Sequence, residues 1–114
     1  MRAWNREIRV YKTADGREPF TKWMASLKNE KVRRAILMRI DRLSLGNPGD
    51  WKTIKTPEAE GLREMRLQLE GGYRLFFAED GPVIIVLLCG GSKATQDSDI
   101  RRAVGYLNDY RSRK

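Results

Sequence analysis

The chain has 114 residues, enough for one domain with a buried core but too few for two domains of ordinary size. It carries 23 Lys and Arg against 15 Asp and Glu, which gives a formal net charge of +8. Such a charge favours polyanionic partners, and the 40% of hydrophobic residues argues against a disordered basic tail. We therefore expect one folded, basic domain.

Several chemistries are excluded by what the composition lacks. The chain has one cysteine, Cys89, and no histidine, so it cannot form an internal disulfide or a zinc site. Serine hydrolase and histidine-dependent ribonuclease mechanisms are also excluded, because the histidine that acts as their base is missing. The first residues have no apolar stretch of about 7–15 residues as in a signal peptide. The most apolar run, residues 83–89, is far shorter than the roughly 20 residues that cross a bilayer. We expect a cytoplasmic protein without a cofactor, a metal or a membrane anchor.

The first half of the chain predicts a strand and two helices. Trp4, Ile8 and Val10 alternate with polar neighbours, a pattern typical of a half-buried strand. Apolar residues recur at helical spacing after Pro19, and a longer helical pattern runs from residue 32 to residue 45. Asn29 is the expected N-cap of this longer helix, and residues 46–50, Gly-Asn-Pro-Gly-Asp, form a loop.

The second half predicts four strands and a final helix. Residues 52–54 fit a short strand, and strand-like runs at 62–69, 73–79 and 83–89 follow one another through short Gly-containing connectors, which indicate antiparallel hairpins. The last run is apolar on both faces, as in a central strand. A helix follows around residues 100–107. The order β-α-α-β-β-β-β-α defines an α+β domain that covers residues 1–114, with a mostly antiparallel sheet of four to five strands.

A pair of arginines on neighbouring strands is the first candidate for chemistry. In the run 62–69, Arg66 shares a polar face with Glu64 and Gln68. Arg74 lies at the start of the next strand, so Arg66 and Arg74 are expected to stand close together. A fold accepts two neighbouring guanidinium groups more readily when an anion binds between them. Exposed arginines are also common on sheets, so this spacing leaves a purely structural role open.

Further basic and aromatic residues extend this candidate site. Lys93 lies in Gly-Gly-Ser-Lys-Ala-Thr-Gln at 90–96, a glycine-rich turn whose backbone amides could bind phosphate, although a plain strand-to-helix connector fits equally well. Lys52, Lys55 and Arg63 are candidate RNA-binding cations, and Phe76 is the best candidate for stacking on a base, although most aromatic residues belong to the core. RNA carries its own nucleophile, the 2′-hydroxyl, so positioning and charge stabilisation suffice to promote its cleavage.

Short motifs in a fixed order also carry a family resemblance over nearly the whole chain. They are Asp-Gly at 15–16, Pro-Phe at 19–20 before Trp23, Arg-Ile-Asp-Arg-Leu at 39–43, Gly-Asn-Pro-Gly-Asp at 46–50, Glu-Met-Arg at 64–66, Gly-Tyr-Arg-Leu at 72–75 and the 90–96 segment. With these motifs the chain resembles the addiction-module killer proteins, the HigB-like toxins of the RelE/ParE superfamily. The resemblance implies a RelE-like fold, with two N-terminal helices over the sheet and a concave basic face.

The same resemblance implies a function and site residues. It implies a type II toxin-antitoxin module, cleavage of mRNA on the ribosome and a tight complex with a cognate antitoxin. By position, Arg74 and Arg66 would bind the scissile phosphate, Lys93 would stabilise developing negative charge, and Lys52 or Lys55 would bind RNA or transfer a proton. Some RelE-type toxins have a catalytic tyrosine near the last helix, where this chain reads Asp-Ser-Asp-Ile at 97–100, so the general base stays open.

Two other functions remain as alternatives from the sequence. ParE-type members of the same superfamily poison a protein target, DNA gyrase, without an enzymatic step, although the basic sheet residues argue against this. An RNA-binding module that leaves RNA intact is the other alternative, and its affinity would fall with salt by about 0.7 log units per log unit of salt for each phosphate contact.

Overall fold

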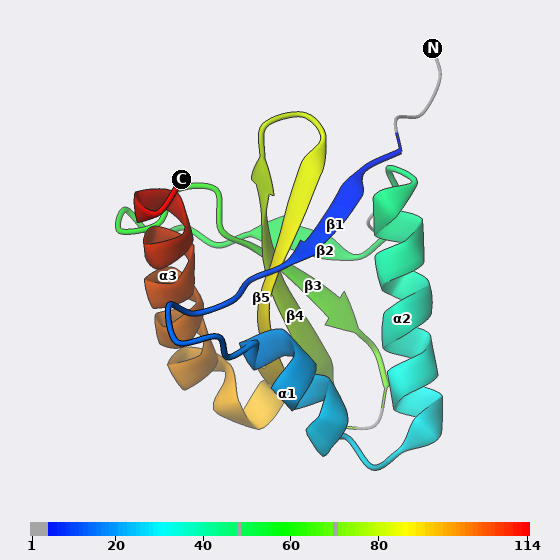
Figure 1. Cartoon of the computed structure of the whole chain (residues 1–114). Helices are drawn as coiled ribbons and strands as arrows, with labels where there is room; N and C mark the ends of the chain where they lie inside the picture. The colour runs from blue at the N-terminus through cyan, green and yellow to red at the C-terminus, as the bar shows by residue number, and fades with distance from the viewer. Residues whose placement is uncertain (1–4, 48, 70) are drawn as a thin grey trace.

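The computed structural model describes residues 5–47, 49–69 and 71–114, so Trp4 of the expected first strand, Pro48 and Glu70 lie outside the described residues. The elements follow the predicted order (Figure 1). They are β1 (Glu7–Val10), α1 (Pro19–Ser26), α2 (Glu30–Ser44), β2 (Trp51–Thr53), β3 (Arg63–Leu67), β4 (Tyr73–Asp80), β5 (Ile84–Ser92), the 3₁₀ turn η1 (Lys93–Thr95) and α3 (Gln96–Ser112). Within the described residues, no helix is long and apolar enough to span a membrane.

One five-stranded sheet organises the domain. Its strand order is β1-β5-β4-β3-β2, with antiparallel pairing throughout except between β1 and β5, which run parallel. The expectation of a mostly antiparallel α+β sheet is thus confirmed. The position of β5 inside the sheet explains why this run is apolar on both faces, as the sequence predicted.

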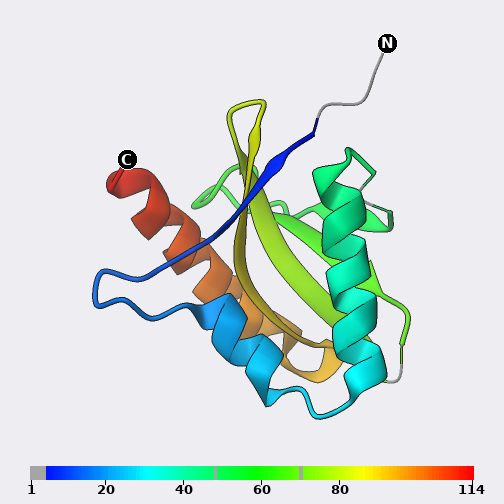
Figure 2. The same ribbon diagram turned by 45° about the vertical axis from the view of Figure 1, so that its right-hand side comes forward.

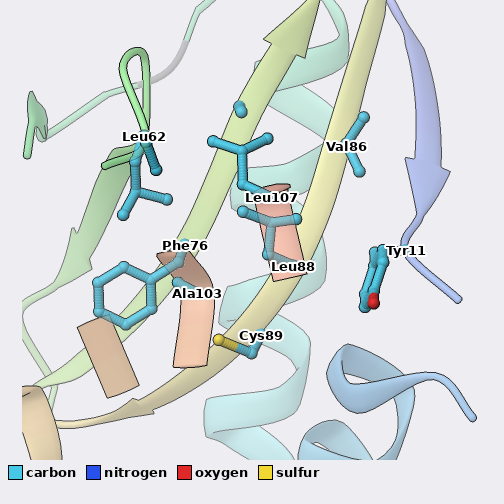
Figure 3. Close-up of a cluster of buried hydrophobic side chains, with 10 residues drawn as sticks. Tyr11, Leu62, Phe76, Val86, Leu88, Cys89, Ala103 and Leu107 are labelled. Carbon is cyan, nitrogen blue, oxygen red and sulfur yellow. The ribbon is translucent and has the colours of Figure 1, made fainter. Parts of the chain in front are cut away.

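Helices cover both faces of the sheet. α1 and α2 lie on one face and α3 on the other, which Figure 2 shows from the side. The α3 side holds a core that includes Phe76, Leu88, Ala103 and Leu107 (Figure 3). The other side packs apolar residues of both N-terminal helices against the sheet. Two layers of apolar contacts therefore fix β4 and β5 between them.

Local sequence signals explain where the helices begin. Pro19 lies in the first turn of α1, and the Asn29 side chain accepts hydrogen bonds from the backbone N–H groups of Lys31 and Val32 at 2.9 and 3.3 Å, as expected of an N-cap. Asp97 and Asp99 lie in the first turn of α3, where the helix dipole favours negative charge.

The glycine pair before Lys93 has a packing role that the sequence did not reveal. Gly90 and Gly91 lie inside β5 and pair with β4 rather than forming a loop around an anion. A Cβ added at Gly90 would lie 2.3 Å from the Trp23 ring, and one at Gly91 would lie 1.7 Å from the Asp99 carboxylate. The two glycines therefore belong to the strand and give room for neighbouring side chains, and they are not part of a turn.

Candidate functional site

The two arginines singled out in the sequence lie side by side on neighbouring strands. Arg66 of β3 is the register partner of Arg74 of β4, so the predicted proximity is confirmed. On the next pair of strands, Lys52 of β2 is the partner of Glu64. Residues that are directly opposed, or two apart along a strand, project to the same face, which here is the face covered by α3. A cluster of Lys52, Glu64, Arg66 and Arg74, called the arginine site below, therefore lies at the β2–β3–β4 part of this face.

Carboxylates compensate both guanidinium groups. Arg74 donates from Nη1 to Oε2 of Glu64 at 3.0 Å, and Arg66 donates from Nη2 to Oδ1 of Asp50 at 3.1 Å. The Glu64 side chain is fully buried, whereas the Asp50 side chain is 43% exposed. The expected repulsion between the arginines is thus offset inside the protein, and the fold is electrostatically viable without a bound anion.

The pairing with Arg66 also stabilises the ionised form of Asp50. The hydrogen bond from Arg66 holds the pKa of the Asp50 carboxyl below its usual range, and a second hydrogen bond from Gln68 adds to the effect. A carboxylate with a lowered pKa is a weak proton acceptor near neutral pH. Asp50 therefore orients Arg66 and is poorly suited to be a general base.

Each arginine of the pair has one buried donor without a partner among the residues that the structure describes. The Nε–H groups of Arg66 and Arg74 are buried and have no hydrogen-bond partner among the described residues. Arg6 and Arg63, on the opposite face, share this property, so an unused Nε–H does not by itself mark a binding site. Two guanidinium groups in direct cross-strand register distinguish the arginine site, because one phosphate group can accept from both.

Two lysines supply charge that the described residues do not compensate. Lys52 and Lys93 are exposed, and neither ammonium forms an ion pair within the described part of the chain. The Lys93 backbone N–H donates to the carbonyl oxygen of Gly72 at 3.0 Å, which fixes η1 against the turn before Arg74. A hollow of about 380 Å³ at this end of α3 is lined by Lys93, Ala94, Thr95, Gln96, Asp97, Ser98 and Arg101.

Three of the predicted RNA-binding residues lie apart from the arginine site or cannot reach a ligand. Arg63 projects to the opposite face, where it pairs with Glu79 at 2.6 Å and lies 4.8 Å from the centre of the Trp51 ring. Lys55 is exposed in the loop after β2. The expectation that Phe76 stacks on a base is wrong, because α3 covers the middle of β4 and leaves Phe76 with 0% exposure (Figure 3).

Residues at the arginine site, or bound to it, were missed or misjudged from the sequence. Alternation placed Glu64 on a polar face but did not show that it is buried, and Gln96 was not singled out, although its Nε2 donates to Oε1 of Glu64 at 3.1 Å. Asp50 was assigned only to a loop. Asp50 could have been predicted from the charges of the site, because two neighbouring guanidinium groups require carboxylates nearby.

The described residues contain no group of three or more His, Cys, Asp or Glu side chains placed to hold a metal ion. What the arrangement can do chemically is bind an oxyanion between Arg66 and Arg74, with added positive charge from Lys52 and Lys93. The fold and the site thus define a small α+β protein with a mixed five-stranded sheet and a cluster of basic side chains on one of its faces.

Comparison with known proteins gives the family. Residues 22–104 match the family described as "Phage derived protein Gp49-like (DUF891)", and the chain belongs to this family. It is also similar to an uncharacterized protein of Haemophilus influenzae, with 40% identity over 84 residues that cover 74% of this chain and 81% of the relative. The family match contains every candidate site residue, from Lys52 to Lys93.

Proposed function

We propose that this protein is the toxin of a type II toxin-antitoxin module, of the RelE/HigB kind, and that it cleaves mRNA on the ribosome. The observation that carries the proposal is the cross-strand pair Arg66 and Arg74, each oriented by a carboxylate on the protein. The motif resemblance, membership of the phage-derived Gp49-like family and the net charge of +8 agree with it.

In the proposed reaction the RNA supplies the nucleophile. The 2′-hydroxyl loses its proton and attacks the adjacent phosphorus, the bond to the 5′-oxygen of the next nucleotide breaks, and that oxygen takes up a proton. A 2′,3′-cyclic phosphate and a 5′-hydroxyl result, with no net gain or loss of protons. Arg66 and Arg74 bind the non-bridging oxygens and hold the phosphate for in-line attack, since their donors are fixed before the substrate arrives. Lys93 stabilises the developing negative charge, and Lys52 binds a flanking phosphate.

A cognate antitoxin would be the natural partner of such a surface. The proposed site is positively charged, so the antitoxin should present acidic side chains or an amphipathic segment that covers it. Lys52 and Lys93 are the exposed cations that such a partner would reach first.

The test is induced expression in a bacterial host, with mapping of the 5′ ends of messages. The wild type should arrest growth and produce in-frame cuts within translated regions. Arg74→Lys keeps a cation opposite Glu64 but loses the forked geometry, and Lys93→Ala removes an exposed charge, so each should lower cutting by about 10- to 100-fold. Arg42→Ala removes another exposed positive charge, from the last turn of α2, and should leave cutting unchanged.

The outcomes separate the proposal from its rivals. Growth arrest without cuts would refute RNA cleavage and favour a protein target such as DNA gyrase. Binding of ribosomes with intact message would favour an RNA-binding module. Equal loss in the Lys93 and Arg42 variants would show that total charge matters rather than the arginine site.

A further inference from the structure

Glu64 is the most deeply buried charged side chain at the arginine site. It has 0% exposure, and it accepts a hydrogen bond from Arg74 of β4 at 3.0 Å and one from Gln96 of α3 at 3.1 Å. Its carboxylate therefore joins three elements, since Glu64 itself belongs to β3. Through these two hydrogen bonds, Glu64 connects Arg74 to the helix.

Burial and bonding together restrict what Glu64 can do. A buried carboxylate is costly unless charged or polar donors surround it, and here each of its two oxygens is bound by a different donor. A side chain without exposure cannot touch RNA in this conformation. Glu64 is therefore unsuited to binding substrate or accepting its proton, and within the described residues its side-chain hydrogen bonds go to Arg74 and Gln96.

We propose that Glu64 is the positioning residue of the site, which fixes the Arg74 guanidinium relative to the first turn of α3. Gln96 begins α3 and follows directly on η1, the turn that starts at Lys93. By holding Arg74 and Gln96 at once, Glu64 sets the separation between Arg74 and Lys93, two of the groups that would act on one phosphate. This inference rests on the proposed function for the role of Arg74 as a phosphate ligand.

A second buried carboxylate provides a matched control. Asp99 in the first turn of α3 has 1% exposure and binds Thr95, at 2.5 Å, and Arg102. Its partners thus differ from those of Glu64, although it belongs to the same helix that Gln96 begins. Glu64→Gln and Asp99→Asn are the same chemical change, a buried carboxylate replaced by its amide, but only the first alters the carboxylate that binds Arg74.

The kinetic test measures kcat and KM for cleavage of message in a purified ribosome assay. Glu64→Gln should lower kcat by about 10-fold or more, because the neutral amide holds the guanidinium less firmly, while KM changes by less than about 2-fold. Asp99→Asn should leave kcat within about 2-fold, whatever its effect on thermal unfolding. Equal losses of kcat in both variants would overturn the proposal in favour of a general structural role.

A double-mutant cycle tests whether Glu64 acts through Arg74. Arg74→Gln is expected to lower kcat strongly, and adding Glu64→Gln to it should change kcat by less than about 2-fold, since the residue to be positioned is gone. The double variant also removes the buried carboxylate that Arg74→Gln leaves uncompensated, so it stays testable if Arg74→Gln alone unfolds. Multiplicative losses from the two substitutions would contradict the proposal.

A measurement independent of cleavage separates this inference from the proposed function. The Nε–Hε signal of Arg74 in a ¹⁵N NMR spectrum should be sharp and protected in the wild type and broadened in Glu64→Gln, but unaffected in Asp99→Asn. If the wild type cleaves no RNA and these signals behave as stated, the proposed function fails while the positioning by Glu64 stands. If the Arg74 signal is already averaged in the wild type, the positioning itself is refuted.

Discussion

Replacing Gly91 by alanine is the sharpest test of the packing between β5 and α3. The new Cβ would lie 1.7 Å from Oδ2 and 2.5 Å from Cγ of Asp99, which is too close for atoms that are not bonded to each other. The obstacle is a carboxylate with 1% exposure that is bound to Thr95 and Arg102, so it cannot simply swing into solvent. The helix or the strand must shift, or the carboxylate must leave its partners.

The expected loss of stability follows from these two responses, a shift of the backbone or a carboxylate that leaves its partners. Overpacking a well-filled region costs about 1–3 kcal/mol, and a buried carboxylate that loses a partner costs about 1–3 kcal/mol more. We therefore expect Gly91→Ala to lower the free energy of unfolding by about 3 kcal/mol, which for a chain of this length lowers Tm by roughly 10–20 °C. Urea unfolding followed by circular dichroism measures the difference.

The same substitution elsewhere provides the control. Gly105 lies in α3 with nothing within 4 Å of an added Cβ, so Gly105→Ala should raise stability by about 0.5–1 kcal/mol through helix propensity. Adding Asp99→Ala to Gly91→Ala should recover part of the loss, because the clashing atoms are removed. A Gly91→Ala variant within about 0.5 kcal/mol of the wild type would refute the close contact and the fixed place of α3.

Three further predictions address the core and its titrating groups. Phe76→Ala should cost about 3–5 kcal/mol in urea unfolding, whereas Phe76→Leu should fold and bind single-stranded RNA with wild-type affinity; a loss of affinity in the folded variant would restore a stacking role. Burial raises the pKa of the Cys89 thiol to about 12, so a thiol reagent at pH 8 should label native protein at least about 100-fold more slowly than unfolded protein, and rapid native labelling would contradict this burial. Burial, aided by the hydrogen bond to Asp109, raises the pKa of Tyr11 to about 12, so the native state holds this proton more tightly. That contribution is complete below the unfolded value of about 10 and is lost as the pH rises towards 12, so stability should fall less steeply over this range in Tyr11→Phe; identical slopes would refute the shift.

Local patterns predicted the elements well because local physics determines them. The Asn29 cap, the proline in the first turn of α1 and the short connectors between strands depend on neighbours in sequence, and each appears where it was expected. The parallel pairing of β1 with β5 depends instead on segments far apart in the chain, and nothing in the composition of either strand specifies it. Cross-strand register for Arg66 and Arg74 was predictable because the turn between their strands is short.

The sequence pattern could not predict how deeply each side chain is buried. Alternation along a strand assigns a side chain to a face, but burial depends on what covers that face at that point. Phe76 and Arg74 share a face, yet Phe76 is completely buried in the core beneath α3, whereas Arg74 is only partly buried. Glu64 differs from its expected exposure as well. A charged residue on a polar face is expected to be exposed, but Glu64 is buried because Arg74 and Gln96 bind its carboxylate.

The charge balance of the arginine site decides how its variants should be interpreted. Glu64 and Asp50 offset the two arginines, so the uncompensated positive charge of the site comes from Lys52 and Lys93 within the described residues. Arg74→Ala would remove the proposed phosphate ligand and would also leave a fully buried carboxylate without its cation, which costs about 3–5 kcal/mol and can unfold a protein of this size. If the proposed function holds, loss of toxicity in Arg74→Ala is therefore ambiguous, whereas loss in Lys93→Ala with unchanged stability, together with no loss in Arg42→Ala, reports on charge at the site.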